Sequence, residues 1–289
     1  MIKNRMKFSV MLPFVVFSGL AISSLGAHSK DDSQERAGNF SILTYNVAGL
    51  PEGISSSHPI KNTSMISPRL NAFDIVLVQE DFSYHKKLRS KAEHPYISGP
   101  GTDGILGDGL GRFSNFSMTE VEHVAWEECY GTLGYANDCL TPKGFSSATH
   151  EIAPGVFMDI YNLHMDAGSS PGDRAARAVQ MDQLIAAIRK KSAGKAVIVA
   201  GDWNLSGTRE KDLALLDKLL TGEQLTDSCR SLSCGEERID RILFRGNDSI
   251  KLKAVVYKVE LDRFTNKKGK PLSDHDAVSV VFEWEYTGE

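Results

Sequence analysis

The chain has 289 residues, of which 41% are hydrophobic and 24% charged, and its formal net charge is −4 at pH 7. This composition is typical of a globular protein with a sizeable core, and it excludes a strongly basic footprint for nucleic acid. A local basic strip can coexist with an acidic whole, so the charge alone leaves a protein that acts on nucleic acid open.

The N-terminus has the three-part layout of a secretory signal peptide. Three cations precede an apolar run, Phe8–Leu25, and the small residues Gly26 and Ala27 follow it. We therefore predict a signal peptide over residues 1–27, cleaved near Gly26 or Ala27. An uncleaved membrane anchor is the alternative, but Pro13 interrupts the run and the residues after it are polar. The cations are Lys3, Arg5 and Lys7.

The rest of the chain is expected to form one domain. Residues 28–38 are charged and indicate a flexible N-terminal tail, and residues 39–289 are enough for a single layered domain. No later stretch is long and apolar enough to span a bilayer. We therefore predict an exported protein, either secreted or periplasmic. No stable protein partner is evident from the sequence.

Four cysteines form two local pairs in the sequence, Cys129 with Cys139 and Cys229 with Cys234. Export makes their oxidation plausible, so we predict two short-loop disulfides. Free thiols are one alternative. A zinc site is another, but no Cys-x-x-Cys spacing or nearby histidine pair accompanies these cysteines.

Seven segments are predicted to be β-strands. Each is short, rich in β-branched and aromatic residues, and bounded by Gly, Pro, Asn or Asp. Some alternate in polarity and others are continuously apolar, which indicates sheets buried on at least one face. In chain order the segments are 40–47, 74–79, 144–152, 156–163, 196–200, 239–244 and 277–284.

Helices are predicted mainly between the later strands. Arg174–Lys191 has apolar residues at steps of three and four, which is typical of an amphipathic helix, and further helices are predicted over Arg209–Leu220 and part of Ser64–Ala72. Strands first paired in hairpins and then separated by helices favour an α/β fold with two packed mixed sheets covered by helices. Gly99–Pro142 fits neither pattern, and we interpret it as a long functional or disordered loop.

Polar residues stand at one end of several predicted strands, an arrangement that can bring them together in a single cleft. Each could separately be a turn residue, a solvated strand end or a core histidine. Taken together they make chance a poor explanation, because the placement of polar residues at a strand end is repeated six times. Its members are Asn46, Glu80, His164, Asp202, Asn204, Asp240, Asp274 and His275.

These residue types supply what phosphodiester hydrolysis requires. The oxygen ligands Asn46, Glu80 and Asp274 suit a hard cation such as Mg²⁺ or another divalent ion. Asn204 can donate a hydrogen bond to a phosphoryl oxygen. The two histidines, His164 and His275, titrate near neutrality and can exchange protons or stabilise developing charge. A carboxylate such as Asp240 can fix the tautomer of one imidazole and favour its cationic form.

The same motifs resemble those of the endonuclease/exonuclease/phosphatase superfamily, in the family's order along nearly all of the chain after the leader. They are TYNVAGL, VLVQED, YNLHMDA, VAGDWNL, ERIDRIL and LSDHDAV. The resemblance implies the deoxyribonuclease I-like fold, a four-layered α/β sandwich with two packed mixed β-sheets flanked by helices. It also places the site at one end of the two sheets.

Roles follow from the resemblance motif by motif. Glu80 and Asn46 would hold the catalytic Mg²⁺, with Asp274 near a metal or the phosphate. Asp202 would orient or deprotonate the attacking water. Asn204 would hold the phosphate, Asp240 would pair with His275, and His164 would lie across the scissile phosphate. Either His275 or Asp202 could be the general base.

Within the superfamily, CLTPKGFSSATHEI resembles the strand before the first catalytic histidine of bacterial neutral sphingomyelinases and phospholipase C-like enzymes. Lys143 could there face a phosphate or a lipid surface, or be an ordinary lysine at a turn. Asp166 stands where the sphingomyelinase pattern has another polar residue, so it is a candidate for substrate binding that leaves the headgroup open. The aromatic stretch Gly99–Pro142 could dock on a membrane.

These observations favour an exported, Mg²⁺-dependent phosphodiesterase acting on a phospholipid headgroup at a membrane surface. A secreted deoxyribonuclease I-like nuclease is the alternative with the same chemistry, and nucleic acid is then the partner. A catalytically silent binding module is the alternative of another class, although such a module would not need the complete set of acids, amides and imidazoles.

Overall fold

The computed structural model describes most of the chain after the predicted leader. The described residues are 36–55, 57–101, 107–132, 138–235 and 238–288. The predicted signal peptide and nearly all of the predicted tail lie outside them. The first strand, β1 (Ala37–Asn46), begins two residues before the predicted domain start at residue 39.

Strands from the N-terminal and C-terminal parts of the chain form one mixed sheet. Its order is β11-β12-β1-β2-β4-β3, in which β1 pairs in parallel with β2 and antiparallel with β12. This sheet therefore joins the first strand of the fold to the last. Besides β1, its members are β2 (Ile75–Gln79), β3 (Tyr96–Ser98), β4 (Gly111–Ser114), β11 (Ile250–Val259) and β12 (Val278–Tyr286).

The middle of the chain forms a second mixed sheet, ordered β5-β6-β7-β8-β10-β9. Here β7 and β8 run in parallel, since the helix α3 (Pro171–Lys191) connects them, while the other pairs are antiparallel. The members are β5 (Ser117–Ala125), β6 (Gly144–Ala153), β7 (Val156–His164), β8 (Val197–Asp202), β9 (Thr226–Asp227) and β10 (Asp240–Arg245).

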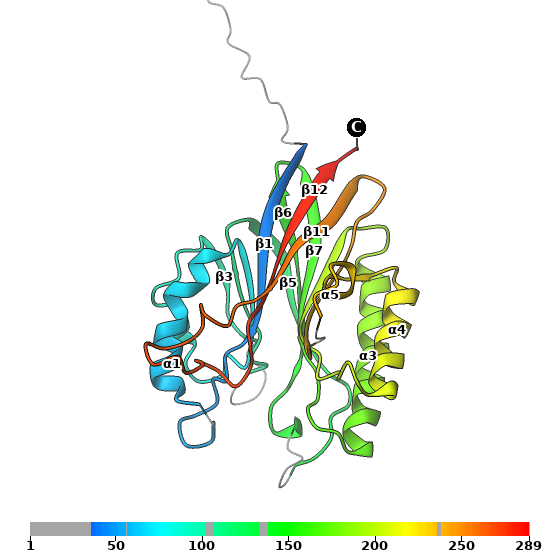
Figure 1. Ribbon diagram of the computed structural model, residues 1–289. Coiled ribbons are helices and arrows are strands. Elements are labelled where there is room, and N and C mark those ends of the chain that lie inside the picture. Colours follow the sequence, from blue (N-terminus) through cyan, green and yellow to red (C-terminus); the bar gives the residue numbers. More distant parts are fainter. Residues whose placement is uncertain (1–35, 56, 102–106, 133–137, 236–237, 289) are drawn as a thin grey trace, which may run out of the picture. The chain divides into compact units, whose positions relative to one another are not determined.

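The two sheets pack face to face with helices on their outer faces (Figure 1). One apolar cluster joins inward side chains of both sheets, such as Phe40, Ile160 and Val280. A second cluster packs α3 and α4 (Glu210–Gly222) against the β7 sheet, and a third packs α1 (Pro59–Ile66) and the 3₁₀ helix η1 (Ser67–Ala72) against the β1 sheet. The predicted four-layered α/β sandwich is confirmed.

The long helix α3 begins earlier than its predicted start at Arg174. Ser170 caps it, because its side chain accepts from the backbone N–H of Asp173 while the Asp173 carboxylate accepts from the N–H of Ser170. Pro171 then occupies the first turn, where its missing N–H costs nothing. Likewise, Pro59 starts α1, five residues before the predicted helix.

The prediction of one long loop over Gly99–Pro142 is wrong for part of its length, because β4 and β5 lie inside it. β5 pairs only with β6 at the sheet edge, and most of its side chains are at least partly exposed, so its sequence lacks the apolar alternation of a strand. β11 was also missed, although its polarity alternates. Short elements complete the fold: α2 (His85–Arg89), η2 (Asp138–Leu140) and α5 (Ser228–Ser231).

Both predicted disulfides form, Cys129–Cys139 and Cys229–Cys234. Among the described residues, the helices are too short or too polar for any of them to cross a membrane.

Candidate active site

The strand ends of both sheets meet at one edge of the sandwich. Asn46 is the last residue of β1, and Glu80 follows β2, its parallel neighbour. In the other sheet, His164 and Asp202 end the parallel strands β7 and β8 and lie in register. Asp240 opens the antiparallel strand β10 opposite Asp202. The predicted residues therefore come together from five strands.

A pair of buried amides joins the two sheets beneath this edge. Gln79 Nε2 donates to Asn162 Oδ1 at 2.7 Å, and Asn162 Nδ2 donates to the carbonyls of Val78 and Gly111 at 2.9 and 3.1 Å. Both side chains are buried, so each bond avoids the cost of an unsatisfied polar group and fixes one sheet relative to the other. The sequence analysis did not single out either residue.

Asp202 lies at the centre of the site. Its Oδ2 accepts from Asn46 Nδ2 at 3.2 Å and lies 3.3 Å from His164 Nε2 and 3.6 Å from His275 Nε2. One carboxylate oxygen thus contacts residues of both sheets. Burial raises the pKa of Asp202 to about 6, and the charge of Asp240 acts in the same direction against that of His275.

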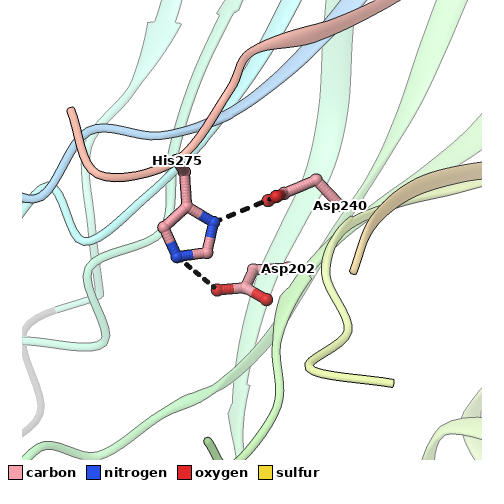
Figure 2. Close-up of side chains that lie close together, drawn as sticks. All are labelled: Asp202, Asp240 and His275. Carbon is pink, nitrogen blue, oxygen red and sulfur yellow. Dashed lines mark hydrogen bonds and ion pairs between the residues drawn. The ribbon is translucent and has the colours of Figure 1, made fainter. Parts of the chain in front are cut away.

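His275 is held in the cationic form by two carboxylates (Figure 2). Its Nδ1 lies 3.0 Å from Asp240 Oδ2, and its Nε2 faces Asp202. Burial alone would lower the pKa of His275. The hydrogen bond and charge of Asp240, with the charges of Asp202 and Asp274, outweigh burial and raise this pKa to about 10.

His164 has the opposite character. It is buried, and among the described residues its Nδ1 has no hydrogen-bond partner. Burial lowers the pKa of His164 well below its usual range, and the positive charges of Lys143 and His275 act in the same direction. His164 is therefore a neutral imidazole at neutral pH.

Glu80 is presented to the site by a strained backbone. Its φ is +57°, an uncommon value for a residue with a side chain, and its carbonyl accepts from the N–H of Gly49 at 2.9 Å. A Cβ atom on Gly49 would lie 2.4 Å from that carbonyl oxygen, so only glycine allows the approach. Asn46 Nδ2 donates to Glu80 Oε1 at 3.0 Å.

The surroundings of Glu80 fit a divalent cation. Burial raises the pKa of Glu80, and the charges of Asp202 and Asp274 add to this effect, so a cation would relieve the repulsion among these carboxylates. In this side-chain orientation Asn46 Oδ1 accepts from the N–H of Ala48 at 3.0 Å. Asn46 therefore steers Glu80 and Asp202, and its own oxygen points away from them.

A second group of potential ligands consists of Asp202, Asp240 and His275, whose nearest ligand atoms all lie within 4.8 Å of one another. We interpret this trio as an ion-pair network, because an imidazolium has no lone pair for a metal. The oxygen-rich surroundings of Glu80 are the better candidate for a hard cation.

Asn204 and Asp274 flank this centre. Asn204 has a φ of +50°, which asparagine tolerates, and its Nδ2 donates to the carbonyl of Met165 at 3.0 Å. Its amide is thus fixed at the end of the neighbouring strand. Asp274 is exposed next to Ser273, whose hydroxyl donates to the carbonyl of Asn46 at 2.7 Å. Ser273 was missed from the sequence, and it ties the loop of His275 to β1.

Lys143 lies at the base of β6, beside the end of β7. Its Nζ forms an ion pair with Asp138 Oδ1 at 2.5 Å, and both side chains are largely buried. This differs from an ordinary exposed lysine at a turn. Its charge acts on Glu80, His164 and Asp202, since it contributes to the pKa of each.

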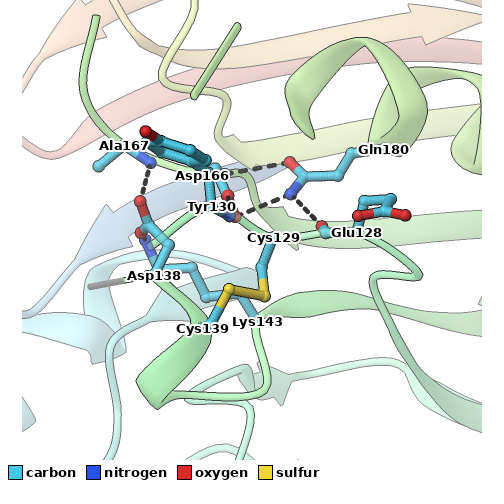
Figure 3. Close-up of a disulfide and its surroundings, with 9 residues drawn as sticks. All are labelled: Glu128, Cys129, Tyr130, Asp138, Cys139, Lys143, Asp166, Ala167 and Gln180. Carbon is cyan, nitrogen blue, oxygen red and sulfur yellow. Dashed lines mark hydrogen bonds and ion pairs between the residues drawn. A yellow bond between two sulfur atoms is a disulfide. The ribbon is translucent and has the colours of Figure 1, made fainter. Parts of the chain in front are cut away.

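Asp166 is buried, and both of its carboxylate oxygens are occupied by protein donors (Figure 3). It accepts from the backbone N–H of Tyr130 and from Gln180 Nε2, each at 2.7 Å. Because it is buried and bonded in this way, Asp166 is placed to hold protein segments together.

Comparisons with known proteins agree with this architecture. The model of the Endonuclease/Exonuclease/phosphatase family matches residues 43–275, so the chain belongs to that family. This confirms the resemblance found in the sequence motifs. Membership of this family agrees with the predicted enzyme class, a phosphodiesterase.

A sphingomyelinase of Mycobacterium tuberculosis is 34% identical over 272 residues, covering 86% of this chain and 53% of the relative. The chain spans about half the length of the curated relatives it matches. Beta toxin from Staphylococcus aureus, solved with bound magnesium ions, is 16% identical with a TM-score of 0.61, covering 84% of this chain and 99% of the toxin. TDP2 from D. rerio, complexed with a single-strand DNA product, is 18% identical with a TM-score of 0.64, at 84% and 98% coverage. The two structures show the shared fold.

Proposed function

We propose that this chain is an exported phosphodiesterase that uses a divalent cation, with Mg²⁺ as the first choice, and hydrolyses a sphingomyelin-like phospholipid. The observation that carries the proposal is the convergence of Asp202 with one cationic and one neutral histidine beside the half-buried Glu80. The lipid preference rests on the sphingomyelinase relatives and on the surface around the site.

Glu80 and Asp274 would hold the cation, with Asn46 orienting Glu80. When bound, the cation supplies positive charge that neutralises the phosphate and lets a nucleophile approach. Glu80 is the main ligand in this assignment, which agrees with the presence of magnesium in the staphylococcal toxin of the same fold.

The protein side chains then divide the proton transfers. Asp202 takes a proton from the attacking water, whose oxygen bonds to phosphorus as the bond to the leaving oxygen breaks. His275 is cationic and gives its Nε2 proton to the leaving oxygen. Asp202 Oδ2 lies 3.6 Å from His275 Nε2, so the proton can return to the imidazole and restore the resting state. Asn204 and Lys143 are the candidates for holding the phosphate.

Exposed apolar side chains surround the site and favour a lipid surface over a polyanion. Ile54 is 73% exposed in the loop after β1, and Leu140 is 64% exposed in the stretch before β6. Tyr130 and Leu261, at 43% and 51%, lie in other loops on the same edge. Such side chains can enter the headgroup layer of a membrane, whereas nucleic acid would call for a basic strip.

The test is to incubate the chain without its leader with sphingomyelin, phosphatidylcholine, plasmid DNA and bis(p-nitrophenyl) phosphate, with Mg²⁺ or with a chelator. Phosphocholine release that needs Mg²⁺ is expected. Cleavage of DNA alone would overturn the lipid assignment in favour of the nuclease, and no product from any substrate would favour a catalytically silent binding module.

A further inference from the structure

A disulfide-closed segment lies beside the site, between β5 and β6. Its described residues are 126–132 and 138–143. The indole of Trp126 donates to the carbonyl of His164 at 2.7 Å, and the N–H of Trp126 donates to the carbonyl of Lys143 at 3.0 Å. Lys143 immediately precedes β6, whose Phe145 lies opposite Leu163 of β7. The base of the segment is thus tied to His164.

The short stretch after His164 contacts both halves of this segment. Asp166 Oδ2 accepts from the N–H of Tyr130, next to Cys129, and the N–H of Ala167 donates to Asp138 Oδ2 at 3.1 Å, next to Cys139. The Cys129–Cys139 disulfide links these two contact points (Figure 3). The segment therefore cannot shift without breaking bonds to the strand end that carries His164.

Gln180 attaches the disulfide-closed segment to α3 as well. Its Nε2 donates to Asp166 Oδ1 at 2.7 Å and to the carbonyl of Glu128 at 2.8 Å, while its Oε1 accepts from the N–H of Asp166 at 3.1 Å. Gln180 and Asp166 are both fully buried. One amide therefore joins α3, the second residue after β7 and the disulfide-closed segment.

The chemistry at position 166 requires two acceptor oxygens. Oδ1 receives the Gln180 amide and Oδ2 receives the Tyr130 N–H, so a carboxylate satisfies both donors, whereas the amide of asparagine would oppose one donor with another. The buried donor left without an acceptor would weaken the attachment of the segment. These two bonds account for an aspartate at a buried position two residues from a site histidine.

We propose that Asp166 and Gln180 are positioning residues, which hold the disulfide-closed segment so that Lys143 stays beside His164. The proposal rests on the proposed function, in which Lys143 helps to hold the substrate phosphate. The ion pair with Asp138 connects Lys143 to this arrangement, because Asp138 also accepts from the N–H of Ala167.

The first experiment measures kcat and KM of Asp166→Asn in the holoenzyme with bis(p-nitrophenyl) phosphate. A fall of about tenfold in kcat/KM is expected, because small displacements of a positioned group are costly. In a Lys143→Ala background the same substitution should change kcat/KM less than about twofold, since both act through one group. An equal loss in both backgrounds would overturn the proposal.

Two further variants separate positioning from general damage. Gln180→Ala removes the amide bonds to Asp166 and to the carbonyl of Glu128, so it should lower kcat/KM about as much as Asp166→Asn and likewise lose its effect in the Lys143→Ala background. Asp182→Asn is the matched control, because Asp182 lies on the exposed side of α3 and its ion pair with Lys218 does not involve the disulfide-closed segment. Its activity should stay within about twofold of wild type.

A readout without turnover keeps this proposal separate from the proposed function. The reduction rate of Cys129–Cys139 by dithiothreitol, followed by mass spectrometry, should rise in Asp166→Asn, while that of Cys229–Cys234 in the same molecule stays unchanged. If the wild type hydrolyses no phosphodiester, the proposed function fails, and the reduction rate of Cys129–Cys139 still tests whether Asp166 holds the segment. An unchanged reduction rate in Asp166→Asn would overturn that role.

Discussion

The two histidines of the site differ in charge although both face the same oxygen of Asp202. His164 is neutral because it is buried without a second partner among the described residues, whereas His275 is cationic because its other nitrogen faces Asp240. Burial acts on both imidazoles in the same direction. The difference shows that a second carboxylate decides which histidine carries the proton.

Removing the cationic histidine should have the largest effect on catalysis. His275→Ala is expected to lower kcat/KM by at least about 10³-fold, because the variant has no group to protonate the leaving oxygen. The measurement is turnover of sphingomyelin and bis(p-nitrophenyl) phosphate with Mg²⁺, beside circular dichroism to show the fold intact. His58→Ala, which removes a histidine that is 82% exposed, is the control and should keep full activity. An active His275→Ala enzyme would refute the assigned role.

The metal side of the site should follow next in magnitude. Glu80→Gln removes the half-buried charge that fits a cation, so we expect the Mg²⁺ concentration for half-maximal activity to rise by about 10–100-fold. Activity is titrated with Mg²⁺ after removal of metal by a chelator. Glu93→Gln removes the same charge from an exposed position and should leave the titration unchanged. Equal Mg²⁺ requirements in Glu80→Gln and wild type would exclude Glu80 as a ligand.

Asp240→Asn tests the origin of the difference between the histidines directly. Asparagine can still accept from His275 Nδ1 but carries no charge, so the pKa of His275 should fall below about 10 while His164 stays neutral. Nuclear magnetic resonance of the imidazole protons over a pH series measures both. We expect kcat/KM at pH 8 to fall about tenfold as less of His275 is protonated. An unchanged titration of His275 would show that Asp202 alone holds its proton.

Much of the fold and the site could be predicted because each key residue belongs to a local pattern. Strands such as AVIVA end in GDWN, and the polar residues after a buried strand must emerge at its end, where Asp202 and Asn204 lie. The short cysteine spacings indicated both disulfides in the same way. Local sequence patterns therefore predicted where the site residues lie, although they did not predict their charge states.

What the sequence could not reveal depends on contacts between distant segments. Gln180 has the pattern of an ordinary polar residue on an amphipathic helix, yet it binds Asp166 and Glu128. Asp138 lies in a stretch with no periodicity, and only the fold brings it to Ala167, 29 residues further along the chain. The opposite charge states of the histidines likewise arise from burial and neighbours, which no motif encodes.

The smallest effect should come from substituting His150, a buried histidine outside the site, and it should be on stability and not on catalysis. His150 is buried on β6, and burial, with the charge of Arg112, lowers its pKa to about 3. Because this pKa is below the unfolded value near 6.5, its contribution to stability is complete above pH 6.5 and is lost as the pH falls toward 3.

Between pH 6.5 and pH 5, His150 alone should lower the free energy of unfolding by about 2 kcal/mol. His150→Leu should remove this part of the pH dependence, as measured by urea unfolding at the two pH values, and should leave kcat/KM at pH 7 unchanged. A variant that kept the full pH dependence would show that His150 is protonated at little cost. Burial would then be insufficient to explain the neutral state of His164 as well, because the same desolvation is invoked for both imidazoles.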